Sequence, residues 1–275
     1  MELSMQLEST GERVIEEFYL SSPANYLIYL FHKVTYNFAR DYVDDKHVLD
    51  YGCGSGYGTH HMASFCKSIV GVDIAGDAIE YAQGHYQAPN LSYTRIEPAD
   101  QAPLPYPDAS FDTVLSFQVI EHIADTGPYL SEIRRVLKPG GVFICATPDR
   151  TTRLLPGQKP WNMWHVHEYD AAGLKTELSG YFENIDLLHM GGKREVLALE
   201  IQRTRRLAWL TLPVTLPFVP EALRIAALRF LKRLAGQGRQ KSLPPMRDFP
   251  FDESDLMIAP DVTPSVNLIA VARKI

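Results

Sequence analysis

The 275-residue sequence lacks the cysteine patterns that mark a disulfide framework or a zinc site. Its three cysteines, Cys53, Cys66 and Cys145, show no spacing typical of metal ligands. Two of them fall in stretches that we expect to be core elements, which indicates reduced and buried thiols. This use of cysteine favours a cytoplasmic protein.

Segments that direct a protein into or across a membrane are also missing. The N-terminal stretch contains Glu2, Glu8, Glu12 and Arg13 and has no apolar core of the kind found in signal peptides. No uncharged run reaches the length of about 20 residues that crosses a bilayer. We therefore expect neither a cleaved leader nor a membrane-spanning helix.

An excess of positive charge is absent as well. Lys and Arg number 27 and Asp and Glu number 33, so the net charge is −6. A protein that follows the phosphates of a nucleic acid needs a basic surface, and this balance argues against a nucleic-acid partner. The sequence also contains no internal repeat.

What is present is the composition of an ordinary soluble protein with a proper core, at 45% hydrophobic and 22% charged residues. Apolar runs typical of buried strands alternate with helical patterns, which predicts an α/β fold with a mostly parallel sheet and right-handed crossovers. The stretches that we expect to form strands are 47–51, 68–74, 91–96, 113–117, 142–146, 182–190 and 266–271.

A glycine-rich turn joins the first of these strands to a helix. In the stretch 48–58, Gly52, Gly54 and Gly56 alternate with other residues, and a helical pattern follows. Missing Cβ atoms let a backbone approach a ligand closely, and the start of a helix offers unpaired N–H groups. The spacing differs from the dinucleotide pattern G-x-G-x-x-G, and no Lys-Ser/Thr pair follows, so a P-loop is excluded. The turn predicts a nucleotide cradle, and the alternative is a tight turn that holds no ligand.

An acidic residue ends the second expected strand. Asp73 follows the run Ile69-Val70-Gly71-Val72 and lies 17 residues beyond Gly56. In a nucleotide-binding fold, an acid at this tip accepts hydrogen bonds from the ribose hydroxyls, and charge-assisted bonds of this kind are strong. Ile74 is then expected to lie against the adenine. The alternative is a solvated acid at a strand end.

The pattern Asp50-x-Gly52-x-Gly54-x-Gly56 resembles motif I of the class I S-adenosylmethionine (SAM) methyltransferases. That resemblance implies a Rossmann-like sheet whose last strand is antiparallel, with SAM as the cofactor. It places Asp100 near the exocyclic amine of the adenine and Gln101 beside it. The residues it implies for the cofactor are Asp50, Gly52, Gly54, Gly56, Asp73, Ile74, Asp100, Gln101 and Phe117.

Further motifs resemble one branch of this family, which is found with polysaccharide, O-antigen and other glycan-modifying pathways. The resemblance covers about residues 8–192. The segments that carry it are Thr-Gly-Glu-Arg at 10–13, His-x-x-x-Tyr at 32–36, the glycine-rich turn, Gly71-Val72-Asp73, and the stretches 115–122, 135–141, 146–149 and 162–169.

Two histidines and a glutamate are candidates for catalysis. Glu121 and His122 follow the fourth strand, and His165 follows the fifth on a connecting loop, together with His167 and Glu168. Ligands of α/β proteins bind at this carboxyl edge of the sheet. We expect His122 or His165 to be a general base, which accelerates a reaction by roughly 10²–10⁴. The alternative is a carboxylate at a helix start beside a packing histidine.

A divalent metal is a second interpretation of the same residues. The pattern Glu-x-x-Glu-His with a later histidine resembles the metal site of the plant small-RNA 2′-O-methyltransferases, and ubiquinone O-methyltransferases carry a similar motif. Gln118 replaces the first glutamate here. Since a neutral ligand weakens a cation site, our prediction is that no metal is bound, and Glu121, His122 and His165 form the alternative metal site.

The chain divides into four expected parts that form one domain. Residues 1–45 form an N-terminal helical cap broken at Ser22-Pro23, where Ser22 is a candidate N-cap. Residues 46–191 form the SAM-binding core, and 263–275 complete the sheet. Residues 192–262 form a lid-like insertion, of which 236–250 is expected to be a mobile loop.

Within this insertion, residues 205–235 combine an uncharged run with a basic amphipathic helix. We expect its cationic face to oppose its apolar face. The cationic residues are Arg224, Arg229, Lys232 and Arg233, and the apolar ones are Ile225, Leu228, Phe230 and Leu231. The segment is either a lid over the substrate pocket or a peripheral membrane contact for a lipid-linked substrate.

The sequence thus predicts a SAM-dependent O-methyltransferase that acts on a hydroxyl of a sugar, glycan or small metabolite. One alternative is RNA-terminal 2′-O-methylation with a divalent metal, which the acidic charge disfavours. Another is a non-catalytic SAM-binding module. The expected partner is a small-molecule or glycan substrate, and the sequence does not indicate an oligomeric state.

Overall fold

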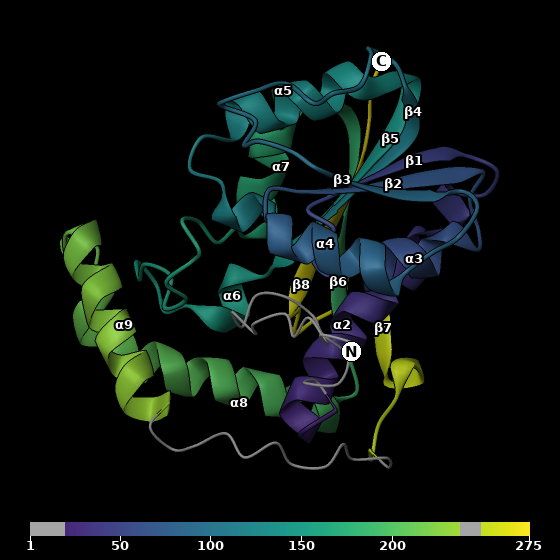
Figure 1. Ribbon diagram of the computed structural model, residues 1–275. Helices are drawn as coiled ribbons and strands as arrows, with labels where there is room; N and C mark the ends of the chain where they lie inside the picture. The colour runs from purple at the N-terminus through teal and green to yellow at the C-terminus, as the bar shows by residue number, and fades with distance from the viewer. Residues whose placement is uncertain (1–19, 237–248) are drawn as a thin grey trace, which may run out of the picture.

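The sheet has eight strands in the order β3-β2-β1-β4-β5-β8-β6-β7 (Figure 1). The glycine-rich turn directly follows β1, which is an inner strand of this sheet. The computed structural model describes residues 20–236 and 249–275. The strands are β1 (His47–Tyr51), β2 (Ser68–Asp73), β3 (Leu91–Arg95), β4 (Phe111–Phe117), β5 (Leu137–Pro148), β6 (Glu183–Gly192), β7 (Leu256–Ala259) and β8 (Asn267–Arg273).

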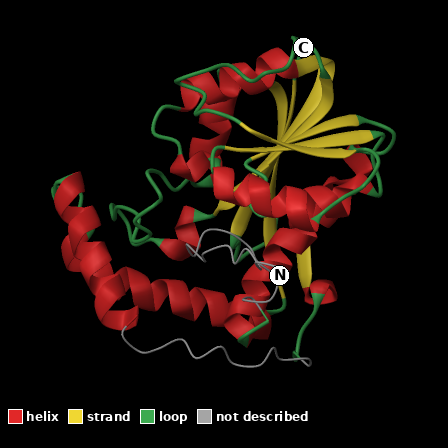
Figure 2. Cartoon of the chain, viewed as in Figure 1, coloured by secondary structure: helices red, strands yellow, loops and turns green. Residues whose placement is uncertain are grey.

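Helices cover both faces of this sheet (Figure 2). The α-helices are α2 (Pro23–Ala39), α3 (Tyr57–Ala63), α4 (Gly76–His85), α5 (Thr126–Val136), α6 (Arg150–Arg153), α7 (Ala171–Ser179), α8 (Arg194–Thr211) and α9 (Glu221–Gly236). In the described part of the chain, four 3₁₀ turns connect elements, at η1 (Arg40–Tyr42), η2 (Ile120–His122), η3 (Leu212–Val214) and η4 (Glu253–Asp255). This arrangement confirms the predicted Rossmann-like α/β fold.

The strand directions agree with the sequence prediction except at one edge. β1 pairs in parallel with both β2 and β4, and β8 pairs antiparallel with β5. The predicted antiparallel last strand is therefore confirmed. β7 was not predicted, because its four residues lie in the stretch assigned to the insertion. It extends the sheet by pairing antiparallel with β6, where Met190 stands opposite Ile258.

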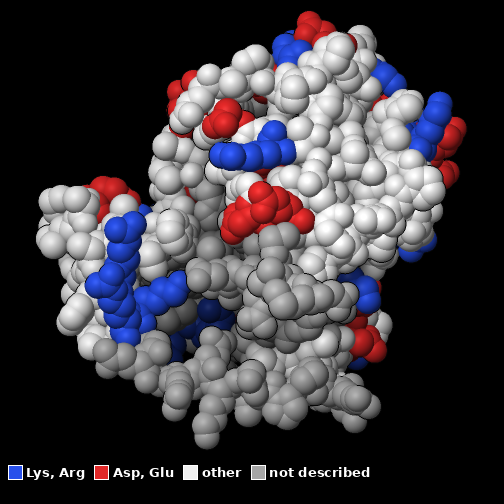
Figure 3. Space-filling model, viewed as in Figure 1, with Lys and Arg blue, Asp and Glu red and all other residues white. Residues whose placement is uncertain are grey.

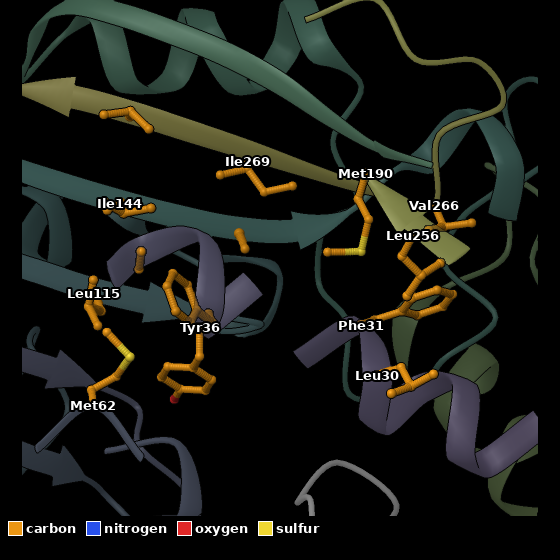
Figure 4. Packing of buried hydrophobic residues seen from close by; sticks show 14 of the residues in the cluster. Leu30, Phe31, Tyr36, Met62, Leu115, Ile144, Met190, Leu256, Val266 and Ile269 are labelled. Atoms are coloured by element: carbon orange, nitrogen blue, oxygen red, sulfur yellow. The ribbon is translucent and has the colours of Figure 1, made fainter. Parts of the chain in front are cut away.

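Alternating strand residues point to two separate cores. On one face Val48, Leu115, Ile144 and Ile269 pack with α2 and α3, as Figure 4 shows for several of these side chains. The neighbouring residues in the same strands point to the opposite face and pack with α5 and α7. They include Leu49, Val114, Phe143 and Leu268. This period of two follows from the pleat of a strand, and both faces are apolar because helices cover both.

Helix α2 begins as the sequence predicts. The Ser22 side chain accepts a hydrogen bond from the backbone N–H of Asn25 at 3.2 Å, and Pro23 occupies the first turn. Leu27, Leu30 and Phe31 are buried against the first face of the sheet. The preceding helix predicted in the cap, the Thr-Gly-Glu-Arg motif at 10–13 and most of the loop predicted at 236–250 lie outside the described residues.

The helices α8 and α9, here called the arm, extend away from the sheet on one side of the molecule (Figure 1). α8 packs against α6 and α2. The predicted orientation of α9 is wrong for Arg224, Phe230 and Leu231. Arg224 is 1% exposed, whereas Phe230 and Leu231 are exposed. The reason is that backbone carbonyl oxygens of the loop at residues 160–165 accept hydrogen bonds from the Arg224 guanidinium inside the protein.

No helix within residues 20–236 and 249–275 is long and apolar enough to cross a membrane.

A buried carboxylate joins α2 to β1. Asp50 Oδ2 accepts hydrogen bonds from the Tyr36 hydroxyl at 3.0 Å and the Thr59 hydroxyl at 2.7 Å. Asp50 Oδ1 has no hydrogen-bond partner among the described residues. Burial raises the pKa of Asp50 to about 6, although both hydrogen bonds act to lower it.

Asp50 is therefore expected to make folding less favourable as pH rises. The native state holds the proton more tightly than the unfolded chain, so stability is lost between about pH 4, near the ordinary pKa of 3.8, and pH 6. At 1.36 kcal/mol per pKa unit the loss is about 3 kcal/mol. Chemical denaturation of Asp50→Asn across this range should show a free energy of unfolding that depends less on pH than the wild-type value. The exposed Asp41→Asn should follow the wild type, and equal pH dependence in all three proteins would contradict the assignment.

Candidate active site

A cavity of about 690 Å³ opens at the carboxyl ends of β1, β2 and β4. The strand order reverses between β1 and β4, and open α/β sheets bind ligands at this kind of switch point. The cavity wall comes from the glycine-rich turn, the ends of β2 and β4, α2, and the loops after β3 and β5. Its volume is typical of a small-molecule site.

The glycine-rich turn needs glycine for two reasons. Gly52, Gly54 and Gly56 have φ values of +79°, +54° and +83°, which favour glycine. A Cβ on Gly52 would lie 2.4 Å from Val119 Cγ2, and a Cβ on Gly56 would lie 2.6 Å from Ala82 Cβ. Gly52 and Gly54 line the cavity, whereas Gly56 packs behind it against α4 and β3.

Asp73 fixes the shape of this turn from the end of β2. Its Oδ2 accepts a hydrogen bond from the Gly54 N–H and its Oδ1 accepts one from the Ala75 N–H, each at 2.9 Å. Both Asp73 and the adjacent Ile74 line the cavity, and Ile74 is 53% exposed there. An acid held beside an exposed apolar side chain is suited to a ribose and its base.

Six of the nine residues expected to bind the cofactor line the cavity. They are Gly52, Gly54, Asp73, Ile74, Asp100 and Phe117. The other three do not. Asp50 is buried and points to α2, Gly56 lies behind the turn, and Gln101 is exposed outside the cavity. The His-x-x-x-Tyr motif contributes two cavity residues, His32 and Tyr36.

The other end of the cavity brings together the three residues predicted for catalysis. Glu121 and His122 form η2 after β4, and His165 lies on the loop between α6 and α7. The ring centroids of the two histidines are 4.9 Å apart, with the rings nearly perpendicular. One potential ligand atom from each of the three residues lies within 4.8 Å of those from the others. His122 lines the cavity, whereas Glu121 and His165 are buried beside it.

The hydrogen bond of each histidine fixes its tautomer. His122 Nδ1 lies 3.1 Å from the carbonyl oxygen of Trp164, which only accepts, so Nδ1 carries the hydrogen. His165 Nδ1 lies 2.9 Å from Glu168 Oε1. Although burial acts to raise it, the charge of Arg153 and the His165 contact lower the pKa of Glu168 to about 2, so Glu168 is an ionised acceptor. In the neutral form of either histidine, Nε2 therefore carries the lone pair.

The carboxylate of Glu121 is buried and only partly hydrogen-bonded. Its side chain is fully buried, and Oε2 accepts a hydrogen bond from the Thr147 hydroxyl at 2.9 Å. No donor in the described part of the chain reaches Oε1. A buried carboxylate oxygen of this kind is costly unless a proton, water or cation meets it.

Gln118, three residues before Glu121, has a left-handed φ of +58° and lines the cavity.

Two arginines that were not predicted as site residues hold the loop that carries His165. Arg153 pairs with Glu168 at 3.1 Å and lies over the Trp161 ring. Arg224 of α9 donates to the carbonyl oxygens of Pro160, Asn162 and His165, and it pairs with Glu221. Apart from Glu221, the polar partners of these two guanidinium groups lie 15 or more residues away in the sequence, so no local pattern signals their position. His167, which we had grouped with His165, is exposed and lies outside the cavity wall.

The part of the chain that forms much of this cavity matches a known protein family. A family model described as a methyltransferase domain matches residues 49–145, which span β1 to β5 and include the glycine-rich turn, Asp73, Glu121 and His122. His165 and the arm lie outside the matched segment.

Several curated proteins are similar to the chain over more than this segment. A probable SAM-dependent methyltransferase of Mycolicibacterium smegmatis is 37% identical over 177 residues, which are 64% of this chain and 65% of that protein. A second, from Mycobacterium tuberculosis, is 34% identical over 62% of this chain and 60% of its own length. A ubiquinone biosynthesis O-methyltransferase of Bartonella tribocorum is 33% identical over 50% of this chain and 54% of its own. The chain thus spans about half to two thirds of the length of these relatives.

Solved structures share the fold. A SAM-dependent methyltransferase from Thermotoga maritima, described as a possible histamine N-methyltransferase, superposes with a TM-score of 0.56. It is 13% identical and covers 91% of this chain and 92% of its own. The [4+2]-cyclase SpnF gives a TM-score of 0.54 at 18% identity, over 88% and 80% of the two chains. From the sheet order and the solved structures, we conclude that the chain has the fold of a class I methyltransferase, and residues 49–145 are similar to a methyltransferase domain.

Proposed function

We propose that the protein transfers a methyl group from SAM to a hydroxyl of a sugar, glycan or small metabolite, with His122 as the general base. The observation that carries this proposal is a single cavity with two chemically different ends. One end has the glycine-rich turn and Asp73, and the other has His122 beside Glu121 and His165. A donor and an acceptor bound in one cavity meet the requirement for proximity, which contributes up to about 7–11 kcal/mol to such reactions.

The residues at the first end fit the cofactor. The close approach at Gly52 leaves no room for a side chain, and the Asp73 carboxylate stands where ribose hydroxyls donate in nucleotide folds. Ile74 and Phe117 supply apolar surface for the base and the remainder of the cofactor. When bound, SAM supplies an electrophilic methyl group on a sulfonium. The protein's own contribution is to orient the acceptor oxygen and to receive its proton.

His122 is the better placed of the two candidate bases. It lines the cavity, whereas His165 is 4% exposed and packs edge-on against the His122 ring. With its hydrogen on Nδ1, neutral His122 presents a basic Nε2 to an acceptor hydroxyl. The Trp164 carbonyl stabilises the cation that forms when that proton arrives. Oxygen rather than nitrogen as the acceptor is supported by the ubiquinone O-methyltransferase relatives and by the presence of this base.

A divalent cation is a second candidate for the same end of the cavity. Glu121 Oε1 is buried and has no hydrogen-bond partner among the residues that the structure describes. Together with the Nε2 atoms of His122 and His165 and the Glu168–His165 hydrogen bond, it forms a suitable donor set. Such an ion would lower the pKa of a coordinated hydroxyl. Glu121, His122 and His165 would hold it, and Gln118 offers a neutral oxygen where related motifs have a carboxylate.

The nature of the acceptor rests on the resemblance of the motifs to the glycan-modifying branch. Two alternatives remain distinct from it. RNA-terminal methylation would require binding to a polyanion, which the net charge of −6 opposes. A non-catalytic SAM-binding module would not require the buried chain from Arg153 through Glu168 to His165.

Gly52→Ala is expected to weaken SAM binding by at least about tenfold, or 1.4 kcal/mol. The new Cβ would collide with Val119 and force a residue with a side chain into a left-handed conformation. Isothermal titration with SAM measures the change. Gly84→Ala is the matched control, because a Cβ there meets nothing within 4 Å. An unchanged affinity in Gly52→Ala would contradict the assignment of the cradle.

His122→Ala is expected to reduce the rate of methyl transfer by roughly 10²–10⁴, while SAM affinity stays unchanged. His165→Ala should reduce the rate less, since His165 acts through the His122 ring. The assay follows labelled methyl from SAM into extract fractions separated as nucleotide-sugars, lipid-linked glycans, RNA and protein. The control is His167→Ala, on the same loop but exposed.

Label in a sugar or lipid-glycan fraction would support the proposal. Label in RNA alone would favour the first alternative. Tight SAM binding without label in any fraction would favour the non-catalytic module.

Gln118→Glu should raise the affinity for a divalent ion by at least about tenfold if the second candidate holds, because it adds an anionic ligand. Titration with Mn²⁺ measures this directly, without any acceptor. Gln101→Glu adds the same charge outside the cavity and should leave the affinity unchanged. If wild type and Gln118→Glu both fail to bind Mn²⁺, and EDTA leaves transfer unchanged, the metal alternative is excluded.

A further inference from the structure

The large apolar side chains that are exposed gather on the arm and its connecting loop. Within the described residues, seven of the thirteen exposed large hydrophobic side chains lie between residues 209 and 234. They are Trp209, Leu210, Phe218, Leu223, Phe230, Leu231 and Leu234. Phe218 is 79% exposed, and Trp209 is 64% exposed. A concentration of this kind marks a surface that meets another apolar phase.

Helix α9 is turned so that apolar residues face outward. Its buried face carries Arg224 and Leu228, which lie toward the loop that holds His165. Leu223, Phe230 and Leu234 are spaced by seven and four residues, so they fall within about 40° of one another on the helix. All three are exposed, on the side roughly opposite Leu228. The helix thus presents an apolar stripe away from the protein's core.

Positive charge accompanies this stripe. Residues 205–235 contain six Lys and Arg and one Glu, a charge of +5, so the rest of the chain carries −11. Arg229 and Arg233 are exposed beside the stripe. Figure 3 shows Lys and Arg side chains gathered on the part of the molecule formed by the arm. Cations around an apolar wedge match the headgroups and acyl chains of an anionic lipid surface, whereas an ordinary protein groove needs no such excess.

We propose that the arm is a membrane-binding element that lies on anionic lipid surfaces, with Leu223, Phe230 and Leu234 inserted and Arg229 and Arg233 at the headgroups. The membrane is contacted and not spanned, since no described helix is long and apolar enough to cross it.

The arm also connects the membrane to the cavity. Gln158 donates to the Ala208 carbonyl and to the Thr215 hydroxyl, each at 2.8 Å. Arg224 holds the same loop near His165, and Trp164 of that loop lines the cavity. The acceptor end of the cavity therefore lies beside the element that meets the lipid. If the proposed function is right, the acceptor is an amphiphilic or lipid-linked hydroxyl compound presented at the membrane surface.

Vesicle sedimentation tests the membrane-binding proposal in the absence of SAM and of any acceptor, so its result does not depend on the proposed function. The full chain should sediment with phosphatidylcholine vesicles that contain phosphatidylglycerol, and far less with phosphatidylcholine alone. The triple variant Leu223→Ser/Phe230→Ser/Leu234→Ser should lose at least about tenfold in partitioning. Arg229→Gln/Arg233→Gln should lose about thirtyfold on anionic vesicles, and added salt should weaken the wild type.

Met257→Ser is the matched control, because Met257 is an exposed apolar residue at 54% on β7, away from the arm. It should bind vesicles like the wild type, and SAM binding should be retained in every variant as evidence of folding. Absence of wild-type binding to anionic vesicles would overturn the proposal. Normal vesicle binding by the triple variant would also overturn it. A third contradicting outcome is that the wild type does not bind vesicles but self-associates, and that the triple variant loses this self-association.

Discussion

The left-handed turn after β1 is the constraint on which the rest of the site depends. The N–H groups of Gly52 and Cys53 donate to the Val72 carbonyl, and the Gly54 N–H donates to Asp73. The turn is therefore locked to β2 at the point where the chain reverses between strand and helix. This arrangement sets the floor of the cavity, and the groups from β4, the loop after β5 and the arm are placed around it.

Much of the fold could be predicted from the sequence because its signals are local. The apolar runs of buried strands, the alternating glycines and the acid at the end of β2 are read within a few residues. The edge strand β7 and the inward turn of Arg224 were missed. Both depend on partners far along the chain, namely β6 and the carbonyls near His165. At the site, residue types pointed to the clustering of Glu121, His122 and His165, whereas the placement of Asp50 and Gln101 outside the cavity required the packing itself.

Buried charge organises the acceptor side of the cavity. Glu168 and Arg224 are buried, the Arg153 side chain is 11% exposed, and each of the three is satisfied by several partners. A buried ionic network of this kind adds little net stability, since desolvation opposes the Coulombic gain. Its value lies in fixing one geometry. The Glu168 carboxylate holds His165, and Arg224 holds the backbone around it, so the loop has one position relative to η2.

Tyr36 links helix α2 to the cavity. It lines the cavity and donates to the same Asp50 that supports the turn, and its ring leaves no space for a side chain at Gly58. Docking of α2 and occupation of the cavity are then two linked equilibria. Linkage is reciprocal: a docked α2 raises the affinity for the ligand by some factor, and a bound ligand raises the equilibrium constant for docking of α2 by the same factor. The helix that precedes the sheet in sequence thus acts as a thermodynamic partner of whatever the sheet binds.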